Sequence, residues 1–358
     1  MDLFDDLPPA TDTPTKVDNS AASLFDDIPP ASENEPAAKR KTEDIESDDV
    51  KRPKVSTVRY SLRGFIGERR GERVDMQDAH VILDNLLPLF STQPKKYSRM
   101  AYYGVFDGHA GPRASQFAAD HLHKNIVSRF PKGTIQNHDR EVKMCLIDSF
   151  KKTDTEFLQK ASAASPSWKD GTTAVCVLLL DETLYVANLG DSKVVLCRKE
   201  GDKKTHLRLS KDHSPAQFEE RQRIQKAGGT VREGRVMGVL EVSRSIGDGR
   251  FKHCGIINTP DVVKCPLGEN DQFLVLACDG LWKVFGVEEA VKYISDILED
   301  DSVTLPEEMI SKTNFQSIDP NDKTAIQYEA ACNRIAIEAV KRGSSDNVSV
   351  MLVDITKH

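Results

Sequence analysis

Aspartates at the ends of apolar runs are the feature that most limits how this chain can fold. The stretch 105–109, VFDGH, ends a run rich in Tyr, Val and Phe and precedes a segment with helical spacing of apolar residues. Further aspartates stand in comparable turns, namely Asp78, Asp191, Asp279 and Asp346. A carboxylate at the edge of a buried strand must be solvated, paired or bound to a metal ion. One Asp-Gly turn is ordinary, but the repetition indicates carboxylates that converge on one rim.

The order of the expected elements predicts an α+β fold. Runs rich in apolar and β-branched residues predict strands at 58–67, 79–84, 99–106, 172–180, 183–188, 193–198, 272–278 and 348–355. Helical spacing of apolar residues predicts helices at 112–129, 140–163, 217–227, 287–298 and 325–341. The strands come in antiparallel groups and the helices in pairs, which favours α+β over a parallel α/β sheet. Residues 299–324 are polar and contain proline, so we expect an exposed insertion there.

Residues 1–56 differ in composition from the rest of the chain. They hold 14 of its 56 acidic residues and 7 of its 49 basic residues, so the remainder carries equal numbers of both signs. They also hold 7 of its 17 prolines and only two aromatic residues, Phe4 and Phe25. This composition predicts a disordered acidic tail, followed by one folded domain at 57–356. The neutral domain gives no charge signal for nucleic acid or for a membrane surface.

Other features of the composition point to the cytoplasm or the nucleus. Seven cysteines are scattered without a Cys-x-x-Cys pair, which argues for reduced thiols instead of disulfides or zinc. The acidic start is unlike a secretory or transit peptide. The longest apolar run, Ala174–Leu180, has about seven residues, far fewer than a membrane span requires.

The tail contains a repeat and two basic clusters. The octapeptide LFDDLPPA at 3–10 recurs as LFDDIPPA at 24–31, which predicts two copies of a short docking peptide. Two copies are too few and too close for a solenoid. The clusters at 39–41 and 51–54 are nine residues apart, as in a bipartite nuclear localisation signal. A charge-balanced linker remains the alternative, because acids fill the gap.

The aspartates form a candidate metal site. Oxygen ligands without His or Cys favour magnesium or manganese over zinc or copper. Two such ions about 3.5–4 Å apart would activate a bridging water and clamp an in-line displacement at phosphorus. Asp107 has two oxygens with which to bridge the ions, and the planar guanidinium of Arg73 would hold phosphate oxygens. His109 is suited to move a proton near neutral pH.

Seven motifs, in their order along the chain, resemble those of the type 2C metal-dependent Ser/Thr protein phosphatases. They are RVDMQDAH, VFDGHAG, GTTAVCVLL, ANLGDSK, VSRSIGDG, ACDGLWKVF and GSSDNVSVML, and they span roughly residues 58–355. The resemblance implies a central antiparallel β-sandwich with helix pairs on both outer faces and a two-metal site at one end. It also implies hydrolysis of phosphoserine and phosphothreonine by metal-bound water, without a phosphoenzyme.

The resemblance also implies a set of metal ligands. Asp107 matches the ligand that bridges both metals, and Gly108 matches the backbone-carbonyl ligand of the second. Asp279 and Asp346 match ligands of the first metal. Magnesium or manganese, two ions per chain, is therefore the expected cofactor.

Three catalytic roles are implied in the same way. Arg73 matches the phosphate-binding arginine, His109 the general acid for the leaving hydroxyl, and Asp78 the acid that orients metal-bound water. Many family members have Glu where this chain has Gln77. A neutral amide there can still hold a metal-bound water, but we expect the second metal to be held more weakly.

Other positions are matched less directly. A third ion in the family is held by residues that match Asp191, Asp279 and position 283, and Lys283 puts a stable third site in doubt. Asp248 is expected to support the site from behind. Residues 211–247 resemble the family's flap beside the cleft, where we expect substrate preference.

The alternative interpretation is a pseudophosphatase scaffold that docks partners through the tail. Such a protein should have lost Asp107, Asp279 or Asp346, and all three are present. A metal-dependent nuclease is poorly supported by the neutral domain. The doubled tail motif resembles family members associated with integrin-linked kinase. We therefore expect phosphorylated protein substrates, an integrin-linked kinase complex as the first partner to test, and a monomer.

Overall fold

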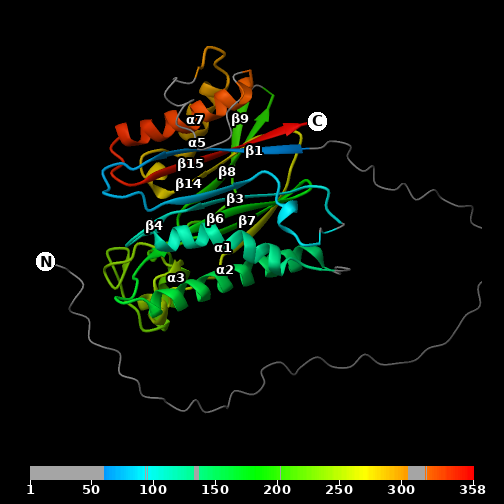
Figure 1. The fold of residues 1–358 in the computed structure, drawn as a ribbon. Coiled ribbons are helices and arrows are strands. Elements are labelled where there is room, and N and C mark those ends of the chain that lie inside the picture. Colours follow the sequence, from blue (N-terminus) through cyan, green and yellow to red (C-terminus); the bar gives the residue numbers. More distant parts are fainter. Residues whose placement is uncertain are drawn as a thin grey trace, which may run out of the picture. The chain divides into compact units, whose positions relative to one another are not determined.

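Two five-stranded sheets are stacked at the centre of the structure (Figure 1). The structure is a computed structural model that describes residues 60–358, apart from 93, 95, 133–136, 202, 305–318 and 320. The first sheet has the order β1 (Tyr60–Arg69), β15 (Val348–Lys357), β14 (Asp271–Ala277), β8 (Lys193–Glu200) and β9 (Lys203–Arg208). The second has the order β13 (Asp261–Pro266), β7 (Thr183–Leu189), β6 (Ala174–Leu180), β3 (Met100–Phe106) and β2 (Ala79–Leu83). Neighbouring strands pair antiparallel throughout both sheets.

The central strands are apolar on both faces because each sheet is covered on both sides. In β6, Val177 lies in the core between the two sheets, and its neighbour Leu178 lies in the core beneath a helix pair. In β14, Leu274 likewise lies in the core between the two sheets, and Val275 lies in the core beneath the other helix pair. Successive side chains of a strand point to opposite faces. A continuous apolar run is therefore what a strand buried on both faces requires.

A pair of helices covers the outer face of each sheet (Figure 1). The second sheet carries α1 (Arg113–Arg129) and α2 (His138–Ala163), and the first carries α5 (Val287–Leu298) and α7 (Lys323–Lys341). The side chain of Asn137 caps α2 by accepting a hydrogen bond from the backbone N–H of Arg140, and Asp322 caps α7 through Ala325. The predicted α+β class, antiparallel sandwich and flanking helix pairs are thus confirmed.

Short elements complete the fold. A three-stranded sheet joins β12 (Ile246–Gly247), β5 (Gly171–Thr172) and β4 (Gly108–His109), and a hairpin joins β10 (Val231–Arg232) to β11 (Arg235–Val236). In the described part of the chain, the other helices are α3 (Phe218–Lys226), the single turn α4 (Asp279–Trp282), η1 (Leu87–Leu89) and η2 (Gly249–Cys254). The segment around α3 has a small core of its own, which includes Ile224, Val236 and Phe251.

Most predicted elements are present within a few residues of their expected bounds. The edge strands β9 and β13 were not predicted, because most of their side chains are exposed or partly exposed and their sequences, KKTHLR and DVVKCP, form no apolar run of useful length. The strand expected at 172–180 is divided into β5 and β6. The predicted insertion at 299–324 lies largely outside the described residues, and its last two residues belong to α7. The predicted tail, 1–56, lies wholly outside them. No helix in the described part of the chain has the length and apolar character needed to cross a bilayer.

Truncating a side chain between the sheets should destabilise the fold strongly. Leu276 on β14 is fully buried in that core, so Leu276→Ala should lower the free energy of unfolding by about 2–5 kcal/mol. Leu207→Ala is the matched control, because Leu207 on the edge strand β9 is 40% exposed and should change stability by roughly 0.5 kcal/mol or less. Urea unfolding followed by circular dichroism measures both. Equal shifts for the two variants would contradict the stacked-sheet core.

Candidate metal centre

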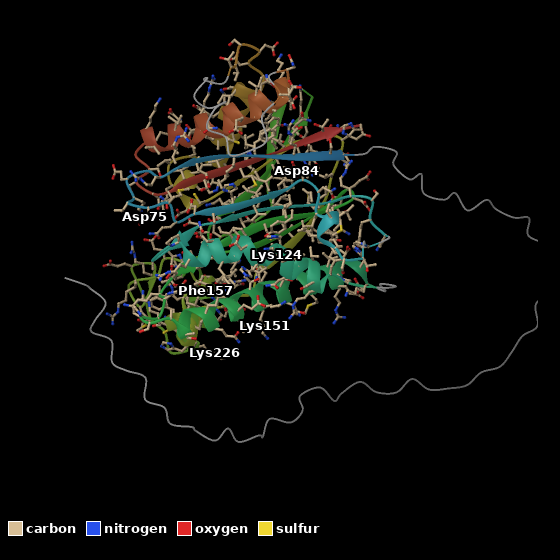
Figure 2. All side chains as sticks on the ribbon, in the orientation of Figure 1. Asp75, Asp84, Lys124, Lys151, Phe157 and Lys226 are labelled. Carbon is tan, nitrogen blue, oxygen red and sulfur yellow. The ribbon has the colours of Figure 1, made fainter. Side chains whose placement is uncertain are left out.

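The aspartates singled out in the sequence lie in turns at one end of the sandwich. Asp107 stands between β3 and β4, and Asp191 lies in the turn that leaves β7 of the second sheet and enters β8 of the first. Asp78 precedes β2, Asp279 begins α4 directly after β14, and Asp346 precedes β15. Both sheets contribute to this end of the sandwich. It is the end at which β4 is labelled in Figure 1 and Asp75 is labelled in Figure 2.

Three of these carboxylates meet directly. Oxygens of Asp107, Asp191 and Asp279 all lie within 4.8 Å of one another. Asp107 also belongs to a second group of three, with Asp78 and Cys278. Carboxylate oxygens of the two aspartates and the thiol sulfur of Cys278 likewise lie within 4.8 Å of one another. Asp107 is therefore the residue shared by both groups. The convergence on one rim that the sequence indicated is present in the structure.

Burial and mutual repulsion disfavour the charged forms of these acids. Burial raises the pKa of Asp78 and of Asp191 to about 7. Burial is the largest of the effects that raise the pKa of Asp107 well above its usual range, and the negative charges of Asp78 and Asp279 raise it further. Asp78 Oδ1 is buried and accepts no hydrogen bond from another described residue. Crowded carboxylates with an unused oxygen are what a site for hard divalent cations requires, so these residues fit magnesium or manganese.

The thiol in this cluster has other hydrogen-bonding partners. Cys278 Sγ donates to the carbonyl oxygen of Asn347 (3.4 Å) and accepts from the backbone N–H of Ser349 (3.1 Å). Burial raises the pKa of Cys278 well above its usual range, which keeps it a neutral thiol. Backbone groups of Asn347 and Ser349 thus engage the Cys278 thiol beside the carboxylates.

Two basic side chains border the acids. Lys283 Nζ lies 2.6 Å from Asp279 Oδ2 and 3.3 Å from Asp346 Oδ2. Arg73 lies 3.0 Å from the same oxygen of Asp346, and its side chain is 57% exposed. Burial lowers the pKa of Lys283, but Asp279 and Asp346 outweigh burial and raise it. The ammonium group of Lys283 thus lies between Asp279 and Asp346, two of the predicted metal ligands.

Gly108 allows two loops to approach closely. A Cβ atom on Gly108 would lie 2.1 Å from the carbonyl oxygen of Gln77, a distance that no side chain tolerates. The hydroxyl of Ser115 donates to the same carbonyl. Gln77 Oε1 accepts from the backbone N–H of Gly111 (3.1 Å). The amide that was expected to hold a water therefore ties the 70–78 loop to the turn after β4.

His109 is held by a buried carboxylate. Its Nε2 lies 2.7 Å from Asp248 Oδ2, and Asp248 is 1% exposed. The hydroxyl of Ser245 donates to the same oxygen at 2.7 Å. Burial lowers the pKa of His109, but the adjacent Asp248 outweighs burial and raises it. Asp248 thus lies behind the imidazole, in the supporting position expected for it.

Asn347 is a positioning residue that the sequence analysis missed. Its Nδ2 donates to the carbonyl oxygens of Arg70 (2.8 Å) and Asp75 (3.1 Å), and its Oδ1 accepts from the N–H of Gln77 (2.8 Å). It therefore holds the loop that carries Arg73. Its position beside Asp346, immediately before an apolar strand, was the available signal.

The segment resembling the family's flap lies beside the carboxylates. The backbone N–H of His213, near the start of this segment, donates to the carbonyl oxygen of Gly190 (2.8 Å), the residue before Asp191. Within the segment, Glu220 accepts hydrogen bonds from Arg223 and Arg244. These ion pairs tie α3, which carries Glu220, to the later part of the segment, which carries Arg244.

Comparisons with known proteins agree with this geometry. The family described as protein phosphatase 2C matches residues 62–348. Integrin-linked kinase-associated serine/threonine phosphatase 2C of Bos taurus is 50% identical over 362 residues, 99% of this chain and 93% of that protein. Probable protein phosphatase 2C 8 of Arabidopsis thaliana is 38% identical over 254 residues, 67% of this chain and 70% of that protein. A serine-threonine phosphatase 2C from Toxoplasma gondii shares the fold, with a TM-score of 0.65 at 20% identity over 82% of this chain and 95% of that one. The chain belongs to the protein phosphatase 2C family.

Proposed function

We propose that the chain hydrolyses phosphoserine and phosphothreonine in proteins at a centre of two magnesium or manganese ions. Membership of the protein phosphatase 2C family supports the serine/threonine phosphatase class. The observation that carries the finer proposal is the meeting of Asp107, Asp191 and Asp279 within 4.8 Å. Family membership alone would not require this meeting, because a scaffold could keep the fold and lose the acids.

The ligands proposed for the ions come from both sheets. Asp107 and the carbonyl of Gly108 are supplied after β3, whereas Asp279 and Asp346 flank strands of the first sheet. When bound, the cations would supply Lewis-acid activation of water and neutralise negative charge on the phosphate. Lys283 already supplies a positive charge at Asp279. For this reason we propose two ions and no stable third ion at Asp191.

The chain's own groups account for binding and proton transfer. Arg73 presents an exposed guanidinium whose fork can bind two oxygens of the phosphate. The unpartnered Oδ1 of Asp78 is an acceptor that would orient the attacking water. His109 would donate its proton to the departing serine or threonine oxygen, and Asp248 would hold the ring and stabilise its protonated form. The products are the free hydroxyl and inorganic phosphate.

A pseudophosphatase scaffold is the second candidate, and one observation favours it. The ammonium group of Lys283 contacts two carboxylates that a cation would otherwise use. A chain of this kind would keep the fold and bind partners without hydrolysing phosphate. The two candidates separate in a phosphopeptide assay with added manganese.

Asp107→Asn should be the most damaging change of a single ligand, because Asp107 is shared by both groups of carboxylates. Its kcat/KM on a phosphothreonine peptide should fall by more than the roughly 100-fold typical of residues behind metal ligands. Asp75→Asn is the matched control, because Asp75 lies at the same end of the sandwich, on the loop between β1 and β2, and is exposed (Figure 2). Phosphate release is measured across a manganese titration. Near-normal turnover by Asp107→Asn would show that Asp107 is not the bridge.

His109→Gln should separate two substrates. A serine or threonine oxygen leaves poorly without a proton, so the variant should lose about 10²–10⁴-fold on a phosphopeptide. An aryl phosphate leaves as a stable phenolate and should lose far less. Asp248→Asn, which weakens the interaction with the imidazole of His109, should also slow hydrolysis of the phosphopeptide more than that of the aryl phosphate, but by a smaller factor. Both substrates are assayed at saturating manganese, and equal losses on both would reduce His109 to a structural neighbour.

We further propose that the tail chooses partners and directs the chain to the nucleus as well as the cytoplasm. The support is the doubled octapeptide and the two basic clusters. Relatives from Bos taurus and Homo sapiens carry names that refer to integrin-linked kinase, so a complex with that kinase is the first partner proposed. The catalytic unit is proposed to act as a monomer on phosphorylated proteins.

Deleting residues 1–56 should leave hydrolysis of a short phosphopeptide unchanged, because the family match begins only at residue 62. The deletion should also reduce nuclear accumulation and recovery of the kinase complex. Imaging of tagged chains and co-purification measure these two effects. Replacing both Phe4 and Phe25 by Ala should weaken partner recovery more than either change alone, since linked copies raise effective concentration. An unchanged distribution after deletion would remove the nuclear signal from the account.

A further inference from the structure

A pocket of about 930 Å³ lies at the end of α1 that is remote from the carboxylates. One wall comes from the loop after η1, and the other comes from the last turns of α1 and the residues that follow. The first turn of α1 adjoins the site, because α1 begins at Arg113, four residues after His109, and the hydroxyl of Ser115 donates to the carbonyl oxygen of Gln77. The 17 residues of α1 span about 25 Å, which separates the pocket from the site (Figure 1).

Aromatic side chains form the interior of this pocket. Phe130 packs edge-on against Phe90, with ring centroids 5.5 Å apart, and against Tyr97 at 5.7 Å. Val127 and Leu89 add aliphatic surface, and Leu89 is 44% exposed. The volume and the mainly apolar lining are those of pockets that hold a ligand or an anchoring side chain.

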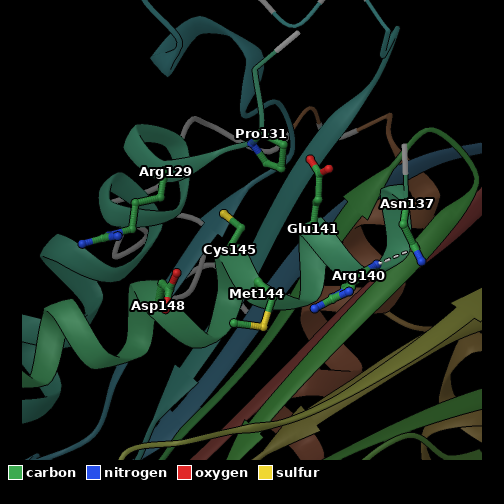
Figure 3. Close-up of a pocket in the computed structure, with 8 residues that line it drawn as sticks. All are labelled: Arg129, Pro131, Asn137, Arg140, Glu141, Met144, Cys145 and Asp148. Carbon is green, nitrogen blue, oxygen red and sulfur yellow. Dashed lines mark hydrogen bonds between the residues drawn. The ribbon is translucent and has the colours of Figure 1, made fainter. Parts of the chain in front are cut away.

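Among the described residues that line this pocket, only lysines are charged. Lys96, Lys124 and Lys132 are exposed at its rim, and none of the three is in a salt bridge with another residue that the structure describes. The adjoining pocket, of about 600 Å³, differs in this respect (Figure 3). It is lined by Arg129 and Arg140 together with Glu141 and Asp148. Of these two neighbouring pockets, the lysine-rimmed pocket is the one that selects a negatively charged ligand.

We propose that the lysine-rimmed pocket docks an acidic segment of the protein substrate, in which a large apolar side chain enters among Phe90, Tyr97 and Phe130 while flanking acids meet the lysines. Charge complementarity favours this occupant over a free anion, because the exposed lysines border a pocket that is also lined by Phe90, Tyr97 and Phe130, and a free anion has no apolar part to place there. The proposal rests on the proposed phosphatase function and adds the class of substrate.

The geometry sets a minimum spacing within the substrate. An extended chain covers at most about 3.6 Å per residue, so at least about seven residues must separate the docked segment from the phosphorylated residue. Docking then acts through effective concentration. It lowers KM for substrates that carry the segment at sufficient distance, and it leaves kcat unchanged.

The experiment compares three phosphothreonine peptides on the full chain with manganese. The first carries Asp-Asp-Leu-Phe-Asp-Asp joined through a 12-residue Gly-Ser linker, the second carries it through a three-residue linker, and the third lacks it. The first should have a KM about tenfold below that of the other two, because a linker of three residues cannot span about 25 Å. Replacing the four acids by Asn should remove the advantage.

Charge reversal of the rim lysines tests whether the lower KM of the first peptide arises at this pocket. Lys124→Glu combined with Lys132→Glu should remove the KM advantage of the first peptide and leave the kinetics of the third unchanged. Lys143→Glu combined with Lys151→Glu is the matched control, because both lysines are exposed on α2 and neither lines the pocket (Figure 2 labels Lys124 and Lys151). Unfolding midpoints of both double variants verify that they fold.

The outcomes are distinguishable. Absence of hydrolysis of all three peptides by the native chain would overturn the proposed phosphatase function. Hydrolysis of all three with the same KM would overturn the docking proposal alone. An advantage that survives reversal at 124 and 132 would also overturn it. If a fluorescent Asp-Asp-Leu-Phe-Asp-Asp peptide fails to bind while inorganic phosphate or anionic vesicles bind and lose affinity on reversal, the pocket holds another anion and the proposal is wrong.

Discussion

The crowding of carboxylates at one end of the β-sandwich is the constraint on which the rest of the site depends. Burial raises the pKa of Asp78 and Asp191 from 3.8 to about 7. The folded chain therefore binds protons more tightly than the unfolded chain. Without a cation, these two acids lower stability progressively as the pH rises from about 4 to about 7. A divalent cation that binds only the folded chain offsets this cost, and its binding is coupled to folding.

Fixed cations offset only part of this charge. Lys283 and Arg73 both contact Asp346, and Lys283 also contacts Asp279. Asp107 has no such basic partner among its strongest influences, which are burial and the charges of other aspartates. Lys283 and Arg73 thus offset part of the negative charge of Asp279 and Asp346, whereas Asp107 is surrounded mainly by other aspartates. A lysine at position 283 therefore reduces, but does not cancel, the negative charge available to the proposed cations.

Much of the fold followed from local patterns, because a strand buried on both faces needs an uninterrupted apolar run. The run at 174–180 is such a strand, with alternate residues in two different cores. The edge strands β9 and β13 left no comparable signal. Within the site, the motif matches pointed to Asp107, Asp279 and Asp346, which periodicity alone could not. Oxygens of Asp107 and Asp279 lie within 4.8 Å of one another, whereas Asp346 shares the ammonium group of Lys283 with Asp279.

The partners of the site residues depend on contacts between distant segments. Asn347 binds the loop at 70–77 across 270 to 277 positions of sequence, and Asp248 contacts His109 across 139 positions. The engagement of Gln77 Oε1 by Gly111 is likewise a consequence of how two loops pack around Gly108. A single sequence does not encode such pairings in any local pattern. The same holds for the lysine-rimmed pocket, whose walls come from segments that meet only in the folded chain.

Anomalous diffraction from a crystal grown with manganese tests the central claim most directly. The account predicts two anomalous difference peaks at the end of the sandwich, with a carboxylate oxygen of Asp107 close to both. One peak would come within ligand distance of Asp279 and Asp346, and the other within ligand distance of the carbonyl of Gly108. A crystal with manganese elsewhere, but no peak among these carboxylates, would contradict the account.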